Sequence, residues 1–517
     1  MNRKYSRMLR AMFASGTALV VNCLINFFVT PYVTRTIGTS AYGFVSLSKN
    51  FQQYAFILTS ALTSFATRYV AVAYHRGDRN EANEYYSTAL LGDVAFATVL
   101  VLTSIPIIMN LEKILRIPVG MESDVKTLMF LTAITFWVDA VGTVCSVGVF
   151  VSDSLARYGT WRALSYVAEG TTLAGCYMLL KPKTFYAGIA ALAAAVVLLV
   201  ASVSITKRKT PNLSARSSSF NPKKVGILLK DGVWTALNGA GDALNTGLDL
   251  LVCNSLLSAT AMGQVAIAKT FHALFPSVTN VVSQAFQPMF LKSWADKDKD
   301  RLLSEMRISM KLSGMFANVM FAGFFALGPA FYSLWIPGQN VDLIYRLTVI
   351  NNLSAIPGGP MQPLYFAYVL SLKKKVPTLV TLAGGVCNVI GMYVLIEFFH
   401  AGPIAVVATT AVVMAAINFV FNPLYLTKAL DLPRTTFLPD VARNALSATI
   451  LCAGFCAVAR IATPTTWLGL AASAVGLGTA GCAIHLAVAC DEGQRKRIVD
   501  MVSARLGKRK GQGEEKK

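Results

Sequence analysis

The chain has 517 residues, of which 54% are hydrophobic and only 14% are charged, and its formal net charge at pH 7 is +21. An ordinary soluble domain carries about a quarter charged residues, so this composition excludes one. Apolar blocks of about 20 residues, long enough to cross a membrane as helices, recur from end to end and indicate an all-α integral membrane protein. The positive charge does not indicate nucleic-acid binding, because the cations lie in short segments between the apolar blocks and in the C-terminal tail.

The apolar blocks predict about fourteen transmembrane helices. The first comes after a basic start, MNRKYSRMLR, as in a signal peptide, but it continues past a short apolar region without a small-residue cleavage site, so we expect a retained helix. The predicted spans are 10–34, 41–73, 84–109, 125–151, 159–181, 184–206, 226–254, 262–291, 305–333, 343–371, 376–398, 402–428, 441–462 and 464–490.

Lysine and arginine gather in alternate loops between these spans. The rich loops share one side with both chain ends, whereas the opposite loops offer Arg35, Lys113, Arg116, Lys181, Lys183, Arg460 and little else. The positive-inside rule therefore predicts a multi-pass protein of the bacterial cytoplasmic (inner) membrane with both termini in the cytoplasm. Residues 491–517 form a polar, basic tail that we expect to lack fixed structure.

Two stretches repeat at a distance of 220 residues: AYGFVSLSKNF at 41–51 and AMGQVAIAKTF at 261–271. The matching positions are Ala41/Ala261, Gly43/Gly263, Val45/Val265, Lys49/Lys269, Phe51/Phe271, Thr59/Thr279 and Asp78/Asp298. A second echo, at an offset of 219, pairs LRIP at 115–118 with LWIP at 334–337. Six predicted helices separate the copies, so both halves face the same way, as in parallel repeats with a substrate site near the bilayer midplane.

We expect an N-lobe of helices 1–6 (1–206), a basic cytoplasmic linker (207–225), a C-lobe of helices 7–12 (226–428), helices 13–14 (441–490) and a basic tail (491–517).

Polar side chains lie along one face of four predicted helices, at the spacings of three and four residues that mark an α-helix. They are Asn22 and Asn26 in the first helix; Ser46, Lys49, Gln53, Ser60, Ser64 and Arg68 in the second; Asp231, Thr235, Asn238, Asp242, Asn245 and Asp249 in the seventh; and Lys269, His272, Asn280, Gln284 and Gln287 in the eighth. A charge at the bilayer centre costs about 2.5–3.5 kcal/mol. We therefore expect these faces to line a hydrated central cavity.

Lys49 and Lys269 are the repeated cations of these faces, and Lys49 lies roughly 12 Å into its helix by helical rise. Together they could bind an anionic group, each could pair with an aspartate of the seventh helix, or each could reach back to the outer surface. The predicted substrate-binding residues are Lys49, Lys269, Asn22, Asn26, Gln53, Arg68, Asp242, Asn245, Asp249 and His272. Arg68 is expected near a cavity mouth or in a local pair.

Two further acids, Asp139 and Glu169, lie inside predicted helices. They could carry coupling protons or Na⁺, with structural hydrogen bonding as the alternative. The tenth helix contains NNLSAIPGGPMQP at 351–363. Pro357, Gly358, Gly359 and Pro360 predict a break there, which could be a hinge for alternating access or only a packing kink.

The nine cysteines lie singly inside apolar blocks without ligand spacing, so we interpret them as small hydrophobic residues and expect no metal and no cofactor. The loops are short, and no phosphate-binding loop or nucleophile–base pair stands out. We therefore expect a protein that is not an enzyme.

TPYVTRTIGTSAYG at 30–43, RYVAVAYHRGDRNEANEYYSTAL at 68–90 and the L-x-I-P loop resemble Wzx-type bacterial polysaccharide flippases, within the multidrug/oligosaccharidyl-lipid/polysaccharide exporter superfamily. The resemblance covers helices 1–12. It implies two six-helix bundles with a cationic cavity open alternately to either side, and a lipid-linked oligosaccharide on an undecaprenyl pyrophosphate as substrate. It also implies membrane lipids and polysaccharide polymerase or assembly proteins as partners, and no nucleic acid.

Two relatives in the same superfamily remain as alternatives. A lipid II flippase also has fourteen helices, but we expect more arginines in helices 1, 2 and 8 than this chain has. A drug/cation antiporter would use an acidic site, and the acids on the predicted cavity faces leave that alternative open. A membrane glycosyltransferase or polymerase would need a large outer loop or a soluble catalytic domain.

Overall fold

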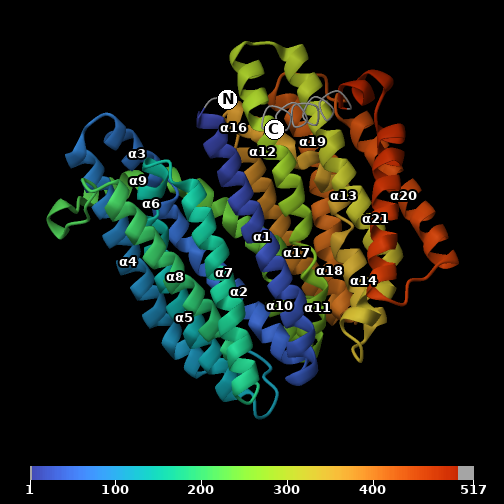
Figure 1. The fold of residues 1–517 in the computed structure, drawn as a ribbon, viewed down its shortest axis with the longest axis horizontal. Coiled ribbons are helices and arrows are strands. Elements are labelled where there is room, and N and C mark those ends of the chain that lie inside the picture. The colour runs from blue at the N-terminus through green and yellow to red at the C-terminus, as the bar shows by residue number, and fades with distance from the viewer. Residues whose placement is uncertain (1–2, 499–517) are drawn as a thin grey trace, which may run out of the picture. The chain divides into compact units, whose positions relative to one another are not determined.

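The computed structural model describes residues 3–498, and every regular element in that range is a helix (Figure 1). The chain divides into two compact units, Met1–Ile267 and Ala268–Lys517, with the boundary inside α11. The predicted lobes are based on the sequence repeat instead, and that division remains a prediction.

The first unit contains α1 to most of α11. Its elements are α1 (Arg3–Thr36), α2 (Thr39–Thr63), α3 (Ala66–His75), α4 (Arg79–Met109), η1 (Leu111–Lys113), α5 (Glu122–Cys145), α6 (Val147–Val151), α7 (Leu155–Leu179), α8 (Tyr186–Lys209), η2 (Ser217–Ser219), α9 (Pro222–Asp242), η3 (Ala243–Gly247), α10 (Asp249–Val252), η4 (Cys253–Leu257) and α11 (Ala259–Lys269).

The second unit contains the remaining helices. They are α12 (Leu274–Ala295), α13 (Lys299–Trp335), α14 (Val341–Asn352), α15 (Ala355–Met361), η5 (Gln362–Tyr365), α16 (Phe366–Leu370), α17 (Lys375–Glu397), α18 (Gly402–Ala416), η6 (Ile417–Phe421), α19 (Asn422–Ala429), α20 (Leu438–Ile461) and α21 (Trp467–Ala489).

Eleven helical segments of the described residues are long and apolar enough to cross a membrane. The other three predicted spans are helical but differ in kind. α7 is a continuous helix that carries Arg157, Arg162 and Glu169, whereas the spans predicted at 226–254 and 343–371 are each divided into several shorter elements. The prediction of an all-α, multi-pass membrane protein is confirmed.

The seventh predicted helix packs inside the first unit, directly against α2. A Cβ atom added at Gly232 of α9 would lie 1.9 Å from the carbonyl oxygen of Ala61 in α2, and one at Gly239 would lie 3.2 Å from Ile57. Only glycine at position 232 permits this backbone approach. Residues 226–267, predicted as the start of the C-lobe, therefore belong to the compact first unit.

The basic linker is held on α4 by hydrogen bonds. Asn83 accepts from the Ser214 backbone N–H at 2.9 Å, and Thr88 accepts from that of Asn221 at 3.1 Å. Lys224 forms an ion pair with Glu84 at 2.9 Å. Residues 214–224 of the predicted linker are thus attached to α4.

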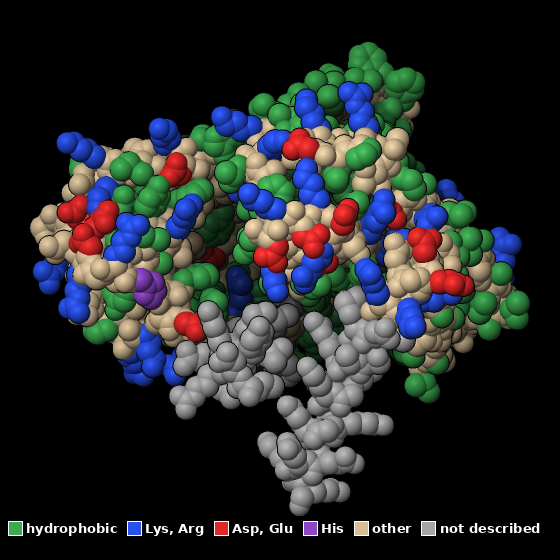
Figure 2. Space-filling model, turned by 90° about the horizontal axis from the view of Figure 1, so that it is seen from above, with side chains coloured by type: hydrophobic (Ala, Val, Ile, Leu, Met, Phe, Trp, Pro, Cys, Tyr) green, Lys and Arg blue, Asp and Glu red, His purple; other side chains and the backbone are tan. Residues whose placement is uncertain are grey.

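One end of the helices is rich in cations. Figure 2 shows many lysine and arginine side chains and fewer acids on the face where α3 ends and α9 begins. In the first unit, Arg76 follows α3, Arg79 begins α4, and Lys207 and Lys209 lie in the last turn of α8; all four side chains are exposed. These are members of the loops that the charge pattern of the sequence assigns to one side.

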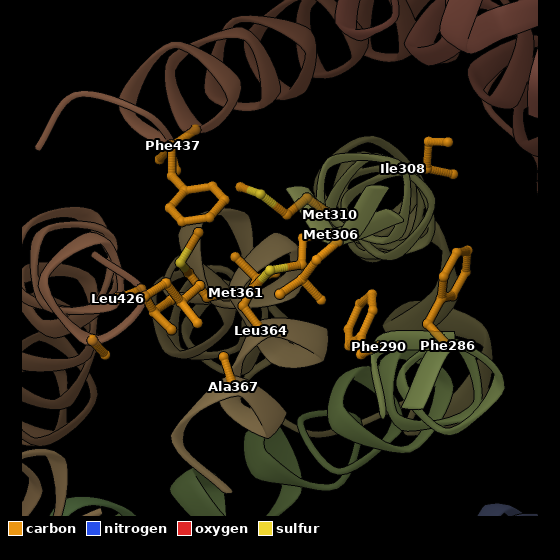
Figure 3. Close-up of a cluster of buried hydrophobic side chains, with 14 of the residues drawn as sticks. Phe286, Phe290, Met306, Ile308, Met310, Met361, Leu364, Ala367, Leu426 and Phe437 are labelled. Carbon is orange, nitrogen blue, oxygen red and sulfur yellow. The ribbon is translucent and has the colours of Figure 1, made fainter. Parts of the chain in front are cut away.

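The second unit has an apolar core to which several helices contribute. Met306 and Met310 of α13, Phe290 of α12 and Met361 of α15 are each at most 1% exposed, and Phe437, just before α20, is fully buried. In Figure 3 these side chains point toward one another from separate helices. Unbranched methionines suit such an irregular junction because they adapt to its gaps.

Helices α20 and α21, the predicted thirteenth and fourteenth, are anchored on α13 by buried polar contacts. Lys311 of α13 is 3% exposed; its ammonium lies 3.3 Å from Asp440 and donates to the carbonyl oxygen of Ala489 at 2.6 Å. His485 of α21, fully buried, contacts the hydroxyl of Ser447 at 2.9 Å. Because a buried charge is tolerated only when it is paired, this arrangement makes both helices part of the second unit.

The expectation that the tail lacks structure is wrong for its first residues. Residues 492–498 are helical, Arg443 pairs with Asp491 at 2.7 Å, and Arg497 donates to Ser304 at 2.7 Å. Ile498 is 3% exposed and joins the apolar core of the second unit. Residues 499–517 lie outside the described residues.

Candidate functional site: a polar cluster inside the first unit

Lys49 lies on α2 with its side chain 53% exposed, within a helical segment that is long and apolar enough to cross a membrane. Its ammonium is 4.0 Å from the Glu169 carboxylate of α7, whose side chain is 19% exposed. This separation is at the outer limit of an ion pair, so the contact is weak. The lysine predicted to bind an anion thus lies beside one of the two acids predicted to carry coupling ions.

The second predicted acid lies in the same group. Gln52, one turn further along α2, donates from Nε2 to a carboxylate oxygen of Asp139 on α5 at 2.8 Å. Arg162 of α7 and Glu169 are the other charged neighbours of Asp139. We call Lys49, Gln52, Asp139 and Glu169 the polar cluster. It offers one ammonium group, two carboxylates and an amide, a set that can bind an anion and a proton or cation in turn.

Gln52 is not among the site residues predicted from the sequence. It sits one position before the predicted Gln53, off the 3–4 periodicity of the polar stripe, and its partner lies 87 residues away. Gln53 itself is exposed, as is Arg68 on α3 beyond the break after Thr63. Both therefore lie at a surface of the first unit, as a binding role requires.

Asn22 and Asn26 on α1 are half-buried and bind each other. Asn26 donates to the carbonyl oxygen of Asn22 at 2.9 Å and to its side-chain oxygen at 3.1 Å. Part of their hydrogen-bonding capacity is thereby used within α1.

The predicted single polar face of the seventh helix is wrong, because two π-helical turns interrupt the α-helix. η3 begins directly after Asp242, which is exposed and accepts from Asn238 at 3.1 Å. Beyond this turn the register shifts, and Asn245 and Asp249 are buried, at 1% and 0% exposure. A π turn widens the helix, so residues three and four apart no longer share one face. Asn245 and Asp249 do not continue the exposed stripe of Asp242.

The first of these π turns serves as an attachment point for α2. The carbonyl oxygen of Gly247 accepts from the Asn50 amide at 2.9 Å and from the Tyr54 hydroxyl at 2.5 Å. A backbone group freed from the helical ladder inside a membrane must find such a partner. Asn50 and Tyr54 flank Lys49 and Gln53, so the π turn fixes the part of α2 that carries the predicted site.

The eighth helix, predicted as one span over 262–291, is also broken. α11 ends at Lys269 and α12 begins at Leu274. Lys269 is half-buried, and His272 lies in the break, with Nδ1 3.0 Å from the side-chain oxygen of Asn352 on α14. Lys269 therefore occupies a helix C-terminus, where the partial negative charge of the helix favours a cation.

The break predicted in the tenth helix exists, but not at the Pro-Gly-Gly-Pro segment. Pro357, Gly358, Gly359 and Pro360 lie inside α15; the helix is interrupted before it, at residues 353–354, and turns 3₁₀ after it, at η5. Pro357 is tolerated because it occupies the first turn. A Cβ atom at Gly359 would lie 2.3 Å from that of Ala317, so Gly359 permits close packing on α13. Their role as a hinge remains a prediction.

Repeat-equivalent residues meet at the start of α2 and α11. Ser40 and Thr260, 220 residues apart, share a hydrogen bond of 3.3 Å. A Cβ atom added at Gly43 would lie 2.9 Å from the Cα of Gly263, and one at Gly263 would lie 2.1 Å from the carbonyl oxygen of Thr39. We call this close contact the glycine seam. It explains why glycine stands at both copies of this repeat position.

The LRIP loop closes over the end of the seventh helix. Asn254 in η4 accepts from the Arg116 backbone N–H at 2.9 Å and donates to its carbonyl oxygen at 3.2 Å. Nearby, Lys126 forms an ion pair with Glu112 at 2.8 Å, and this hydrogen bond lowers the pKa of the Glu112 carboxyl. The loop is therefore ordered by specific contacts rather than only by its proline.

An apolar cavity of about 230 Å³ lies between α2, α4 and α5, and Gln52, which binds Asp139, forms part of its wall. Its two wall hydroxyls, Ser104 and Thr132, donate to carbonyl oxygens of their own helices. Both wall hydroxyls and the Gln52 amide are therefore already engaged in hydrogen bonds within the protein. Within the described residues there is no group of three or more His, Cys, Asp or Glu side chains placed to hold a metal ion.

Comparison with known families finds a match over more than half of the chain. Residues 8–294 match the family described as "Polysaccharide biosynthesis protein". The chain is also 25% identical to an uncharacterised membrane protein, EpsK, of Bacillus subtilis (strain 168), over 487 residues that make up 94% of this chain and 96% of that one.

Solved structures with the same fold are membrane transporters. The lipid II flippase MurJ in an inward closed conformation superposes with a TM-score of 0.67 at 14% identity, covering 91% of this chain and 97% of that one. An inward-facing multidrug resistance transporter of the MATE family, in the MOP superfamily, gives a TM-score of 0.60 at 15% identity, covering 81% and 99%. The predicted resemblance to polysaccharide biosynthesis proteins is confirmed by the family match, and the fold is shared with a flippase and with multidrug transporters.

Proposed function

Because the chain belongs to the polysaccharide biosynthesis protein family, we propose that it is a flippase that moves an undecaprenyl-pyrophosphate-linked oligosaccharide across the cytoplasmic membrane by alternating access. In this proposal the protein is a carrier and not an enzyme, both termini are cytoplasmic, and the glycan is delivered to the polysaccharide polymerase or assembly proteins on the outside. The sugar units are accepted by amide and carboxylate side chains, and the polyprenyl tail remains among membrane lipids.

The observation that carries the proposal is the half-exposed ammonium of Lys49, held only loosely by Glu169 within a transmembrane helix. A pyrophosphate is a multiply charged oxygen ligand and binds lysine by charge-assisted hydrogen bonds. We propose that Lys49 exchanges Glu169 for the pyrophosphate, and that Lys269, its repeat equivalent at a helix C-terminus, supplies a second cation. Protonation of Glu169 would release Lys49, so the cluster would link anion binding to a proton.

Sugar binding is assigned to exposed and half-buried polar residues of the first unit. Gln53, Asp242 and Arg68 are exposed, and Asn22 and Asn26 keep part of their hydrogen-bonding capacity. Asn245 and Asp249 are buried, so they contribute to this role only in a conformation that uncovers them. His272 is also proposed for sugar binding; it lies in the turn between α11 and α12, where its ring contacts the side chain of Asn352.

A drug/cation antiporter is the second candidate, and the two carboxylates of the polar cluster favour it. Asp139 and Glu169 outnumber the single ammonium of the cluster, so a cationic substrate could replace Lys49 beside them. The likeness to a lipid II flippase keeps that substrate as an alternative lipid-linked glycan. The antiporter and the flippase are distinguished by the substrate that the purified protein moves: an organic cation or a lipid-linked glycan.

The test uses proteoliposomes with an undecaprenyl-pyrophosphate oligosaccharide confined to the inner leaflet. We expect the glycan to become accessible to an external glycosidase with the wild-type protein and to remain protected with the Lys49→Ala, Lys269→Ala double variant. The matched control is Lys207→Ala with Lys209→Ala, which removes two exposed lysines at the end of α8. Exposure by the double variant at the wild-type rate would remove the lysines from the mechanism. No exposure by the wild type, together with uptake of an organic cation, would establish the antiporter instead.

A further inference from the structure

Asp93 is a buried acid in the middle of a transmembrane helix. It lies 14 residues after Arg79, the first residue of α4, which corresponds to roughly 21 Å of helical rise. The residue is buried, with 1% of its surface exposed. Among the described residues, neither of its carboxyl oxygens has a hydrogen-bond partner.

The surroundings of Asp93 are apolar on both sides along the helix. Ala89, one turn before it, belongs to an apolar cluster with Leu62 and Val144, and Ala97, one turn after it, belongs to a second cluster with Phe136. The adjacent Gly92 packs so closely on α2 that an added Cβ atom would lie 2.9 Å from Leu62. Apolar residues therefore lie one turn away from Asp93 in both directions, and the adjacent Gly92 packs on the facing helix.

No neighbouring helix supplies a charge that pairs with Asp93. The helices packed against α4 carry several charged and titratable side chains: Lys49 and Tyr54 of α2, Arg68 and Tyr69 of α3, Asp139 of α5 and Asp231 of α9. Asp139 accepts from Gln52, and Asp231 accepts from Tyr69. None of them is hydrogen-bonded or ion-paired with Asp93 in the part of the chain that the structure describes.

An ionised carboxylate in such a place is strongly disfavoured, because it loses its hydration and gains neither a counter-charge nor a donor. A neutral carboxylic acid costs far less. A buried acid that is kept without any structural partner is also poorly explained by packing, since an apolar residue of the same size would fill the space without that cost.

The helix that packs on α4 next to Asp93 is broken close to this acid. The helix that faces Gly92 stops at Thr63, one residue after Leu62, and resumes as α3 at Ala66. Ser64, inside this break, is exposed, and so is Arg68 one turn further on. A broken helix can change its angle at the break more easily than a continuous one.

We infer that Asp93 is a proton-binding site, occupied by a proton in this conformation and emptied when the α2–α3 break opens to water. The proton is taken from the aqueous phase on one side and returned to that on the other, so the ligand is H⁺ and no covalent chemistry is involved. The link between this proton and transport rests on the proposed function. The proton site itself does not.

The first experiment measures the protonated carboxyl directly, in the purified full-length protein. Infrared difference spectroscopy at neutral pH should show the C=O band of a protonated, solvent-shielded carboxylic acid that disappears in Asp93→Asn. This variant preserves the shape of the neutral acid and so should fold. Asp342→Asn, which alters an exposed carboxyl, is the matched control and should leave the band unchanged. Absence of the band in the wild type, or its persistence in Asp93→Asn, would overturn the assignment.

The second experiment asks what the proton does. An imposed pH gradient should accelerate glycan exposure in wild-type proteoliposomes, whereas the rate of glycan exposure by Asp93→Asn should not respond to the gradient. Equal acceleration of both proteins would contradict coupling through Asp93 while leaving flipping intact. If the wild type exposes no glycan, the proposed function fails, and the infrared band still decides whether Asp93 holds a proton.

Discussion

The two copies of the AxGxVxxxK repeat share their sequence but not their helix geometry. In the first copy, α2 continues unbroken through Lys49 for a further 14 residues to Thr63; in the second, α11 ends at Lys269 itself. Lys49 therefore projects from the side of a helix toward Glu169, whereas Lys269 occupies a helix end beside a turn that contains His272. A repeated residue can thus keep its place in the topology while its immediate electrostatic surroundings change.

The residues on the C-terminal side of each lysine account for this difference. The first copy continues with polar residues, Gln52 and Gln53, that remain compatible with a helix, and Asn50 and Tyr54 fasten it to the π turn at Gly247. In the second copy the helix stops, and Phe271 packs in an aromatic group with Phe324, Phe331 and Trp335. The first copy is fixed by hydrogen bonds and the second by aromatic packing.

The largest effect on stability is expected at the glycine seam, where the copies do not differ. Gly263→Ala places a Cβ atom 2.1 Å from the carbonyl oxygen of Thr39, and backbone cannot move aside as a side chain can. Overpacking of this kind costs about 1–3 kcal/mol, and we expect the upper end. The measurement is the denaturant midpoint of the reconstituted protein.

Gly226→Ala is the matched control for the seam, because nothing lies within 4 Å of its added Cβ atom. In a helix that change is worth up to about 1 kcal/mol in the stabilising direction. Equal effects of the two substitutions would mean that α2 and α11 do not approach each other as described.

The hydrogen bonds to Gly247 should be the next largest contributors and are specific to the first copy. Asn50→Ala and Tyr54→Phe each remove one donor from this carbonyl oxygen, at a cost of about 1 kcal/mol each. The double variant leaves the carbonyl unsatisfied, so its loss of stability should exceed the sum of the two. If chemical denaturation shows that the stability losses of the two single variants simply add up in the double variant, the two donors do not share the Gly247 carbonyl oxygen as described.

The helix caps offer a case in which the copies should respond alike. Asp78 and Asp298, which are repeat-equivalent, each accept a backbone N–H three residues on, at 2.9 Å, and so begin α4 and α13. Alanine at either position should cost about 1 kcal/mol. Thermal unfolding should show equal decreases in the melting temperature for the two cap variants. The control Asp300→Ala, inside the first turn of α13, should show a smaller decrease. Unequal losses at 78 and 298 would show that the copies have diverged here too.

The smallest change in stability is expected at the Lys49–Glu169 pair. Glu169→Gln removes a contact of 4.0 Å to a lysine that is half exposed, which should alter stability by less than about 1 kcal/mol. Its effect on function should be larger, because Lys49 would then be free of a competing carboxylate and should bind a polyprenyl pyrophosphate more tightly. Weaker binding by Glu169→Gln would show that the acid supports the ligand instead of competing with it.

Much of the architecture was predictable because membrane helices are recognisable by their length and composition. The all-helical fold, the repeat and the partnership of Asp139 and Glu169 with intramembrane polar groups could be inferred from apolar blocks and the cost of burying charge. Asp78 and Asp298 likewise precede their helices as capping residues should.

The breaks and π turns were not predictable from periodicity. Asn245 and Asp249 continue a 3–4 spacing in the sequence, but the inserted π turn rotates them away from Asp242, and spacing alone cannot reveal a change in residues per turn. The Pro-Gly-Gly-Pro segment was a misleading break signal, because a proline in the first turn and a glycine at a close contact are both compatible with a helix. Asp93 lies alone in the predicted span 84–109, as Asp139 and Glu169 do in theirs, but it was not singled out; its lack of a hydrogen-bond partner is visible only in the structure.

The central claim is that Lys49 and Lys269 bind the pyrophosphate of the substrate, and it is tested most directly by binding rather than transport. Polyprenyl pyrophosphate without sugar would be titrated into the wild-type protein, each single alanine variant and the double variant, all in lipid nanodiscs. A charge-assisted hydrogen bond is worth about 1.5–3 kcal/mol, so each single variant should bind about tenfold or more weakly, and the double variant more weakly still. Binding by both single variants with wild-type affinity would contradict the account.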